Sequence, residues 1–342
     1  MSRRSPRASR RQEPVTISEV AAAAGVARSS VSRAFTKPHL LSAGTVSRIR
    51  ETAARLGYVP NPYARGLSTG RSGNIGMILP DVANPFFPPM IRAAQDAADL
   101  SELCVFLGNS NEDPAQEQRL ASRFTSQVDG LILASSRMAE EEVRALAAQR
   151  PVVLINRDLD GLPRVLIDAV PGMRSAAQYL AALGHRRVAY VSGPSNSWSN
   201  TARQQALETA AEEFGLELVV LCACVPSFEA GEAMAEPFLA AGATVAIAFD
   251  DLTAHGLMKA LGVLGVAVPQ DVSIVGCDDV LGRLTTPGLT SIANRSAEAG
   301  RHAVALLSDL LYEASGQETR VVLPADLVIR KSTGPAVAIP AA

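Results

Sequence analysis

The chain has 342 residues and a mass of 35.9 kDa, which is too long for one ordinary domain and indicates two or three. Hydrophobic residues make up 47% and charged residues 19%, so a disordered chain is excluded. No apolar run approaches the roughly 20 residues that span a bilayer, which excludes a membrane protein, and no apolar stretch follows the basic N-terminus, so we expect no secretory signal and a cytoplasmic location.

The net charge of −2 conceals two regions of opposite sign. Residues 1–71 contain 13 Lys and Arg against 3 Glu, whereas the remainder contains 19 Lys and Arg against 31 Asp and Glu. This segregation indicates a small polyanion-binding module joined to a larger acidic body. The alternative, a solvated basic tail, fits residues 1–13, which we expect to be disordered without DNA. It does not fit residues 14–59, whose apolar residues recur at helical spacing.

Three short helices are predicted in residues 14–59. Thr16 and Glu19 have capping-box spacing, so the first helix begins there and ends at Gly25. A second helix follows over Arg28–Phe35, and a third runs from near Thr45 to Gly57. Two helices separated by a few residues around a glycine are typical of a helix-turn-helix.

Two stretches of this region resemble a known family. The string VTISEVAAAAGVARSSVSRAF, followed by LGYVPNPYARGLSTGRSGNIG, is similar to the head of lac-repressor (LacI/GalR) family transcription regulators. The resemblance extends from Pro14 to about Gly334. It implies an all-α helix-turn-helix head joined to an α/β core like that of periplasmic sugar-binding proteins.

The second predicted helix has the width of the DNA major groove, so its N-terminal residues can reach base edges. By resemblance, Arg28 and Ser29 form the specificity pair, and the Arg28 guanidinium can bind guanine O6 and N7 or, alternatively, a phosphate. Ala27 stands where Ser or Thr is usual and removes a helix cap. The DNA-binding residues that we expect in the head are Thr16, Arg28, Ser29, Ser30, Ser32 and Arg33.

Residues 60–72 resemble the hinge segment of the family. A helix here is too short to be stable alone, which fits hinge helices that pair in a dimer and order on DNA. Leu67 would insert into a minor-groove step and kink it. A flexible linker is the alternative. The hinge residues that we expect to contact DNA are Asn61, Tyr63, Ala64, Arg65 and Leu67.

The core, residues 73–334, alternates apolar strands with amphipathic stretches, which predicts βαβ units and two doubly wound parallel-sheet subdomains. The predicted strands are 75–79, 103–107, 130–134, 152–155, 188–193, 216–221, 245–250 and 272–279. The resemblance implies an interlobe cleft with crossovers near 168, 294 and 323. It places residues 73–168 and 295–323 in one subdomain and residues 169–294 and 324–334 in the other, with a tail over 335–342.

Small molecules bind open α/β sheets at the carboxyl ends of the strands. Polar residues at these ends are therefore candidates, and by resemblance Phe86 adds a stacking wall. The expected effector-binding residues are Asp81, Phe86, Asn156, Arg203, Asp250 and Asp278. For the neighbouring Asp251 and Asp279 we expect capping or strand-end hydrogen bonds instead.

The cleft departs from the family pattern. Asp250 replaces a usual Asn, Pro226 and Cys277 stand at positions that are often aromatic, and Ala206 replaces a common Gly. An acid in place of an amide favours a polyhydroxyl or cationic effector over a phosphate. The family resemblance implies a sugar or related metabolite.

Two rival classes of function are weighed against this interpretation. The Asp pairs could hold a metal for hydrolysis, but no zinc-binding spacing, nucleophile elbow, P-loop or dinucleotide fingerprint is present, so we expect no catalysis, metal or cofactor. His185 lies in a helix-to-strand turn and is expected to be structural. A periplasmic receptor conflicts with the basic head. Cys222 and Cys224 lie in an apolar run, so we expect core residues rather than a disulfide.

The sequence therefore predicts a ligand-responsive transcriptional repressor that binds a near-palindromic operator as a homodimer. No heptad repeat follows Gly334, so a tetramer built by a C-terminal coiled coil is not expected. The effector, its sign of action, the operator and the regulated genes stay open.

Overall fold

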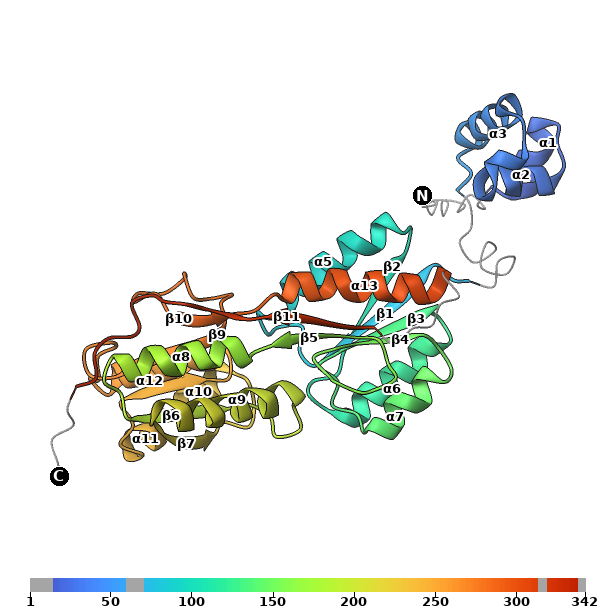
Figure 1. Ribbon diagram of the computed structural model, residues 1–342. Helices are drawn as coiled ribbons and strands as arrows, with labels where there is room; N and C mark the ends of the chain where they lie inside the picture. Colours follow the sequence, from blue (N-terminus) through green and yellow to red (C-terminus); the bar gives the residue numbers. More distant parts are fainter. Residues whose placement is uncertain (1–14, 60–70, 313–318, 338–342) are drawn as a thin grey trace, which may run out of the picture. The chain divides into compact units, whose positions relative to one another are not determined.

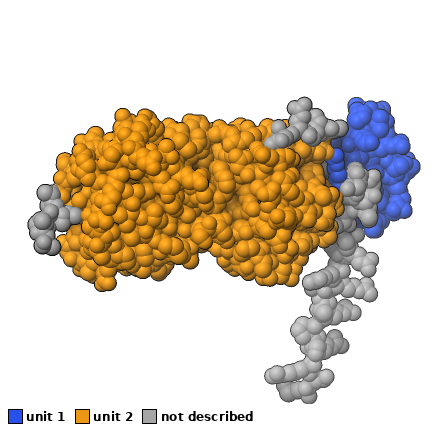
Figure 2. Space-filling model, turned by 60° about the horizontal axis from the view of Figure 1, so that its bottom comes forward, with its two compact units in different colours: residues 1–72 blue, residues 73–342 orange. Residues whose placement is uncertain are grey.

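The computed structural model describes residues 15–59, 71–312 and 319–337. The chain divides into two compact units, residues 1–72 and residues 73–342, coloured separately in Figure 2. The predicted basic tail and most of the predicted hinge, residues 60–70, lie outside the described residues. We describe each unit by itself.

The described residues of the first unit form three α-helices and a short 3₁₀ turn. They are α1 (Ile17–Ala24), α2 (Arg28–Thr36), η1 (Pro38–Leu40) and α3 (Ala43–Leu56). The predicted capping box is confirmed, because the Glu19 N–H donates to Thr16 Oγ1 at 3.4 Å and the Thr16 N–H donates to Glu19 Oε2 at 2.7 Å. The helices α1 and α3 end at Gly25 and Gly57 in the left-handed conformation.

Helix α3 begins two residues before the predicted Thr45. Ser42 is its N-cap and accepts a hydrogen bond from the Thr45 N–H at 3.3 Å, so the capping side chain sets the start. The helices enclose a small core of buried residues, and its members are Val20, Ala21, Ala24, Val31, Ala34, Ile49 and Ala53.

The second unit contains two six-stranded sheets, which confirms the predicted pair of doubly wound subdomains. The first sheet has the order β11-β5-β4-β3-β1-β2 and is parallel throughout. Its strands are β1 (Asn74–Leu79), β2 (Cys104–Asn109), β3 (Gly130–Ala134), β4 (Val152–Ile155), β5 (Arg164–Asp168) and β11 (Arg320–Pro324).

The second sheet has the order β12-β10-β9-β8-β6-β7, and only β12 is antiparallel to its neighbour. Its strands are β6 (Arg187–Ser192), β7 (Glu217–Cys222), β8 (Val245–Ala248), β9 (Ser273–Asp278), β10 (Thr290–Ala293) and β12 (Asp326–Val328). In both sheets the strand order reverses beside the first strand, β1 or β6, which creates a crevice for a ligand at the carboxyl ends.

Helices cover both faces of each sheet (Figure 1). In the lobe that contains β1, which we call the N-lobe, they are α5 (Phe87–Leu100), α13 (Ser296–Tyr312), α6 (Pro114–Thr125) and α7 (Glu140–Ala147). In the C-lobe, which contains β6, they are α8 (Val170–Ala182), α9 (Trp198–Phe214), α10 (Phe228–Ala233), α11 (Ala235–Ala240) and α12 (Asp251–Val263). The chain passes between the lobes after β5, after β10 and after β11. Among the described residues, no helix is both long and apolar enough to cross a membrane.

Helices α10 and α12 pack backbone against backbone. A Cβ atom at Gly256 would lie 1.9 Å from the Phe228 carbonyl oxygen, and a Cβ atom at Gly231 would lie 2.1 Å from the Thr253 carbonyl oxygen. Both distances are far inside van der Waals contact, so these two positions need glycine.

The expectation that Cys222 and Cys224 are core residues is wrong. Both are exposed, and they form a disulfide bond with each other. The reason is the position of β7 at the edge of its sheet, where an apolar run is covered less completely than in a central strand. The edge strand β2 of the other sheet likewise leaves Phe106 and Leu107 partly exposed.

Candidate functional site

Helix α2 presents a polar surface of the head. Arg28, Ser29 and Arg33 are exposed, while Val31 and Ala34 on the opposite side are buried in the head core. Ser30 and Ser32 are half-buried at the margins of the exposed face. The N-cap Ala27 makes no side-chain cap bond, as the sequence predicts. This face has the composition of a base-reading helix, and its DNA contacts stay a prediction.

The other predicted DNA-binding residues have two different outcomes. Thr16 is exposed at the start of α1, where its hydroxyl donates to Glu19 Oε2 at 2.9 Å. The predicted hinge residues lie outside the described residues, so their role stays a prediction, and they are Asn61, Tyr63, Ala64, Arg65 and Leu67.

A cavity lies between the lobes of the second unit. Residues from both lobes line it, and they are Asn84, Phe86, Phe87, Glu112, Ser135, Arg137, Asn156, Ser197, Ser199, Arg203, Pro226, Phe249, Asp250 and Asp278.

Five of the six predicted effector residues line this cavity: Phe86, Asn156, Arg203, Asp250 and Asp278. Asp81, the sixth, is not among the lining residues, and its Oδ1 accepts the Ala83 N–H at 2.9 Å within its own turn. The structure therefore brings together five side chains that lie far apart in the sequence. Their contact with a ligand stays a prediction.

Sequence reasoning missed several lining residues. Ser135 and Arg137 follow β3 and Glu112 follows β2, so the rule applied to the other strands, polar residues after a strand end, would also have found them. Ser197 and Ser199 lie at the N-terminus of α9. They flank Trp198, the only tryptophan of the chain.

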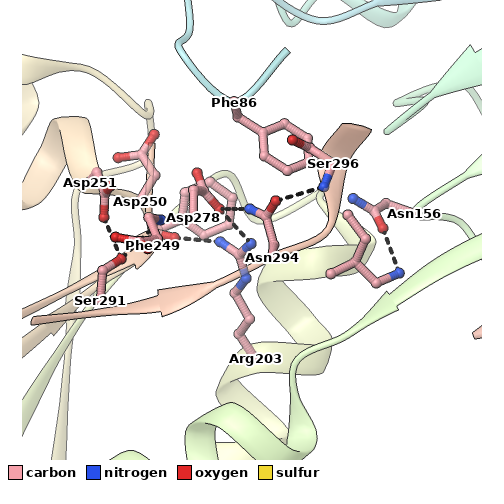
Figure 3. Close-up of polar contacts among 12 residues, drawn as sticks. Phe86, Asn156, Arg203, Phe249, Asp250, Asp251, Asp278, Ser291, Asn294 and Ser296 are labelled. Carbon is pink, nitrogen blue, oxygen red and sulfur yellow. Dashed lines mark hydrogen bonds and ion pairs between the residues drawn. The ribbon is translucent and has the colours of Figure 1, made fainter. Parts of the chain in front are cut away.

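An ion pair of an arginine and a carboxylate lies on the C-lobe side of the cavity (Figure 3). Arg203 Nη2 donates to Asp278 Oδ1 at 3.1 Å, Nη1 donates to the Phe249 carbonyl, and the guanidinium lies 4.8 Å from the centre of the Phe249 ring. Asn294, in the crossover after β10, donates to the same Asp278 oxygen at 2.8 Å. Both side chains of the ion pair are almost completely buried, so each charge requires the opposite charge of its partner to be stable there.

Burial raises the pKa of the acids around this pair. The pKa of Asp278 lies well above its usual range because burial outweighs the attraction of Arg203. Burial also raises the pKa of the Cys277 thiol to about 12, and of Asp251 to about 6. The C-lobe wall is therefore a place of low dielectric in which excess negative charge is costly.

Asp250 connects the two lobes. It is the N-cap of α12, where Oδ1 accepts the Thr253 N–H at 2.8 Å, and its Oδ2 accepts a hydrogen bond from Asn84 Nδ2 of the N-lobe at 3.0 Å. The Asn84 amide is oriented by its other end, because Asn84 Oδ1 accepts the Phe86 N–H at 3.0 Å. The contact between the two lobes therefore requires an acceptor at position 250.

The N-lobe wall is neutral in comparison. Asn156 has a left-handed backbone, and its Oδ1 accepts the Ile167 N–H at 3.0 Å. Arg137 donates through Nε to Glu112 at 2.7 Å and through Nη1 to the Ser135 carbonyl at 2.9 Å. The negative charge of Glu112 therefore compensates the positive charge of Arg137.

The neighbouring acids and His185 have structural roles. Asp251 accepts from Ser291 at 2.6 Å and from the Leu281 N–H at 2.9 Å, Asp279 pairs with Arg330 at 2.5 Å, and buried His185 contacts Thr244 Oγ1 at 2.7 Å. The hydrogen bonds of Asp251 and His185 agree with the structural roles that we expected, whereas the Asp279 side chain forms an ion pair in place of the expected hydrogen bonds. In the part of the chain that the structure describes, no three His, Cys, Asp or Glu side chains gather as metal ligands.

Comparison with known proteins assigns both units. The model of bacterial regulatory proteins of the lacI family matches residues 16–61, and the model of the periplasmic binding protein-like domain matches residues 177–333. The HTH-type transcriptional regulator DegA of Bacillus subtilis is 31% identical over 333 residues, which cover 94% of this chain and 98% of DegA.

Solved structures agree with this assignment. The lac repressor dimer bound to operator and the anti-inducer ONPF has 25% identity and a TM-score of 0.85, over 94% of this chain and 100% of that chain. A LacI family transcriptional regulator from Enterococcus faecium with bound ribose has 27% identity and a TM-score of 0.71, over 77% of this chain and 100% of the other. The chain therefore belongs to the lacI family of bacterial transcriptional regulators.

Proposed function

We propose that this regulator is a repressor that binds a near-palindromic operator as a homodimer and that a small molecule in the interlobe cavity, a sugar or related metabolite, controls its operator affinity. One observation carries the proposal. Side chains from both lobes converge on one cavity, in a chain whose head exposes a polar recognition helix, and these side chains are Phe86, Asn156, Arg203, Asp250 and Asp278.

The DNA-binding part rests on helix α2. One copy of α2 in each half-site, with Arg28 and Ser29 at base edges and Ser30, Ser32 and Arg33 on phosphates or bases, reads the operator. The solved lac repressor dimer bound to operator supports this arrangement. The hinge residues 61–67 add minor-groove contacts, with Leu67 as the wedge.

The effector part rests on the cavity. A ligand that contacts both lobes binds one interlobe angle better than another, and its binding energy then shifts the population of the DNA-binding conformation. The ribose bound to the Enterococcus faecium relative supports a carbohydrate-sized occupant.

We also infer that the chain has no catalytic activity and works in the cytoplasm, where its DNA lies. The relatives are named as regulators, and the acids of the cavity are held by Arg203, Thr253 and Asn84 rather than arranged around a nucleophile.

A gel-shift assay tests the proposal. The purified chain is mixed with the DNA upstream of its own gene and of adjacent genes, because repressors of this kind act close to where they are encoded, with and without D-ribose and related sugars. We expect the protein to retard one fragment, and we expect excess unlabelled copies of that fragment to compete for the protein. We also expect a sugar to change the fraction of this DNA that is retarded. Absence of retardation at low ionic strength, for every fragment and sugar, would overturn the proposal.

A further inference from the structure

The charges on the cavity wall narrow the chemical class of the effector, an inference that rests on the proposed function of the cavity. Five ionisable side chains line it. Three are carboxyl groups, of Glu112, Asp250 and Asp278, and two are guanidinium groups, of Arg137 and Arg203. The lining therefore has one more acid than base.

Both guanidinium groups already have carboxylate partners. Arg137 Nε lies 2.7 Å from Glu112 Oε2, and Arg203 Nη2 lies 3.1 Å from Asp278 Oδ1. Further donors of these arginines bind the carbonyls of Ser135 and Phe249. An anionic ligand would have to compete with these partners, and breaking a buried ion pair leaves an uncompensated charge.

Asp250 has no ion-pair partner of its own among the described residues, although the buried Arg203 guanidinium is close enough to interact with its charge. It is 2% exposed, and among the described residues it forms hydrogen bonds but no ion pair. Its hydrogen-bond donors are the backbone of Thr253 and the amide of Asn84, both uncharged. The N-terminus of α12 offsets part of the charge, but Asp251, the next residue and 1% exposed, adds negative potential. Each carboxylate oxygen of Asp250 can still accept another hydrogen bond.

The aromatic lining also suits a cation. The faces of Phe86 and Phe87 carry partial negative charge, and both rings line the cavity. Phe249 already has the Arg203 guanidinium over its ring. In Figure 3, Phe86 lies on one side of the polar groups of Asp278 and Asn294, and Arg203 lies on the other.

We propose that the effector is a small polyhydroxylated amine, such as an amino sugar, whose ammonium group binds Asp250. Hydroxyl groups of the ligand use Asn156 and the Arg203–Asp278 pair, because a hydroxyl both donates and accepts hydrogen bonds. The ammonium supplies the counter-charge that the cavity wall lacks. A neutral sugar leaves Asp250 uncompensated, and a phosphate or carboxylate adds to the repulsion.

A matched set of sugars tests this proposal. In the glucose, galactose and mannose series, the neutral sugar, its 2-amino derivative and its 6-phosphate share one ring, and binding is measured at pH 6.5 by calorimetry and by the fluorescence of Trp198. We expect an amino member to bind about tenfold or more tightly than its neutral partner, as for a hydrogen bond to a charged group, and the phosphate to bind most weakly. Stronger binding by a neutral or phosphate member, or no binding by any amine, would overturn the proposal.

Two variants locate the effect. Asp250→Asn keeps a residue type that caps helices well but removes the negative charge. We therefore expect the amine and the neutral sugar to bind this variant with about equal affinity. Asp113→Asn makes the same change at the N-cap of α6, which does not line the cavity, and it keeps the preference. A preference that survives in Asp250→Asn contradicts the assignment of Asp250.

The gel-shift assay separates this proposal from the proposed function. If the chain binds DNA specifically but a phosphate or neutral sugar binds best in the cavity, the inference about charge fails and the proposed function stands. If the chain binds no DNA, the proposed function fails whatever the ranking of the sugars.

Discussion

The two walls of the interlobe cavity differ in kind. The C-lobe wall places Arg203, Asp250 and Asp278 in a buried and acidic surface, whereas the N-lobe wall offers the amides of Asn84 and Asn156 and the ring of Phe86. The charged pair on the N-lobe side, Glu112 with Arg137, is balanced. On the proposed function, we expect the C-lobe to recognise the charge of the ligand and the N-lobe to supply neutral hydrogen bonds and an aromatic contact. A ligand must meet both walls to hold the lobes at one angle.

Arg203→Ala removes the base of the C-lobe wall. The variant leaves Asp278 buried without its partner, so we expect a loss of about 3 kcal/mol or more in the free energy of unfolding, measured in urea. We also expect the effector response to disappear while the folded protein keeps its DNA affinity. The control Arg174→Ala removes an exposed ion pair with Glu213 and should leave the urea midpoint unchanged. An unchanged effector response would remove Arg203 from the site.

The acidity of the C-lobe wall predicts a pH dependence through Asp251. Its pKa is raised to about 6, against an unfolded value of about 3.9, so the folded protein favours the protonated form. The contribution of Asp251 to stability is therefore complete below about pH 4 and is lost, by about 3 kcal/mol, as the pH rises through 6. The free energy of unfolding, compared between the natural chain and Asp251→Asn from pH 4 to 7, measures this loss. Parallel pH profiles for both proteins would contradict it.

A substitution in helix α2 of the head alters neither cavity wall. Arg28→Ala removes the expected base contact of α2, so we expect a loss of about 1–3 kcal/mol in operator binding and little change for unrelated DNA. Ligand affinity should stay as it is, because neither wall has changed. Equal losses on operator and unrelated DNA would assign Arg28 to a phosphate.

The smallest expected effect is that of Asn84→Ala, which removes the hydrogen bond between the walls. We expect the contact to be worth about 1 kcal/mol, so the ligand-free lobes populate a more open state and the radius of gyration in solution scattering increases slightly. Asn109→Ala, which removes a hydrogen bond to Val82 within the N-lobe, serves as the control. If both variants scatter alike, Asn84 does not set the lobe angle.

Much of the fold could be predicted because buried parallel strands are short apolar runs, and the runs at 75–79 and 130–134 became β1 and β3. The apolar run that ends at Cys222 led to the wrong prediction that its cysteine is buried. An edge strand and a central strand have the same local pattern, and only the strand order distinguishes them. Similarly, Ser42 capped α3 earlier than helical spacing alone indicated.

The site could be predicted where a polar residue follows a strand, as for Asn156 and Asp278. Asp81 satisfies the same rule, yet its side chain turns back onto Ala83. Asn84 lies in the polar stretch that follows the same strand, but its hydrogen bond to Asp250 could not be predicted, because Asp250 lies 166 positions away and meets it only across the cleft. Local sequence therefore predicts which residues are available, and the lobe geometry decides which of them meet.

The glycine contacts between α10 and α12 have a consequence for how the protein responds to its ligand. Backbones that touch at Gly231 and Gly256 have no side chains between them that could repack. Asp250 immediately precedes α12 and Pro226 lies two residues before α10, so both cavity residues are anchored to one rigid block. We therefore expect a bound molecule to displace that block as a whole, with the movement at the three crossings between the lobes rather than inside either one.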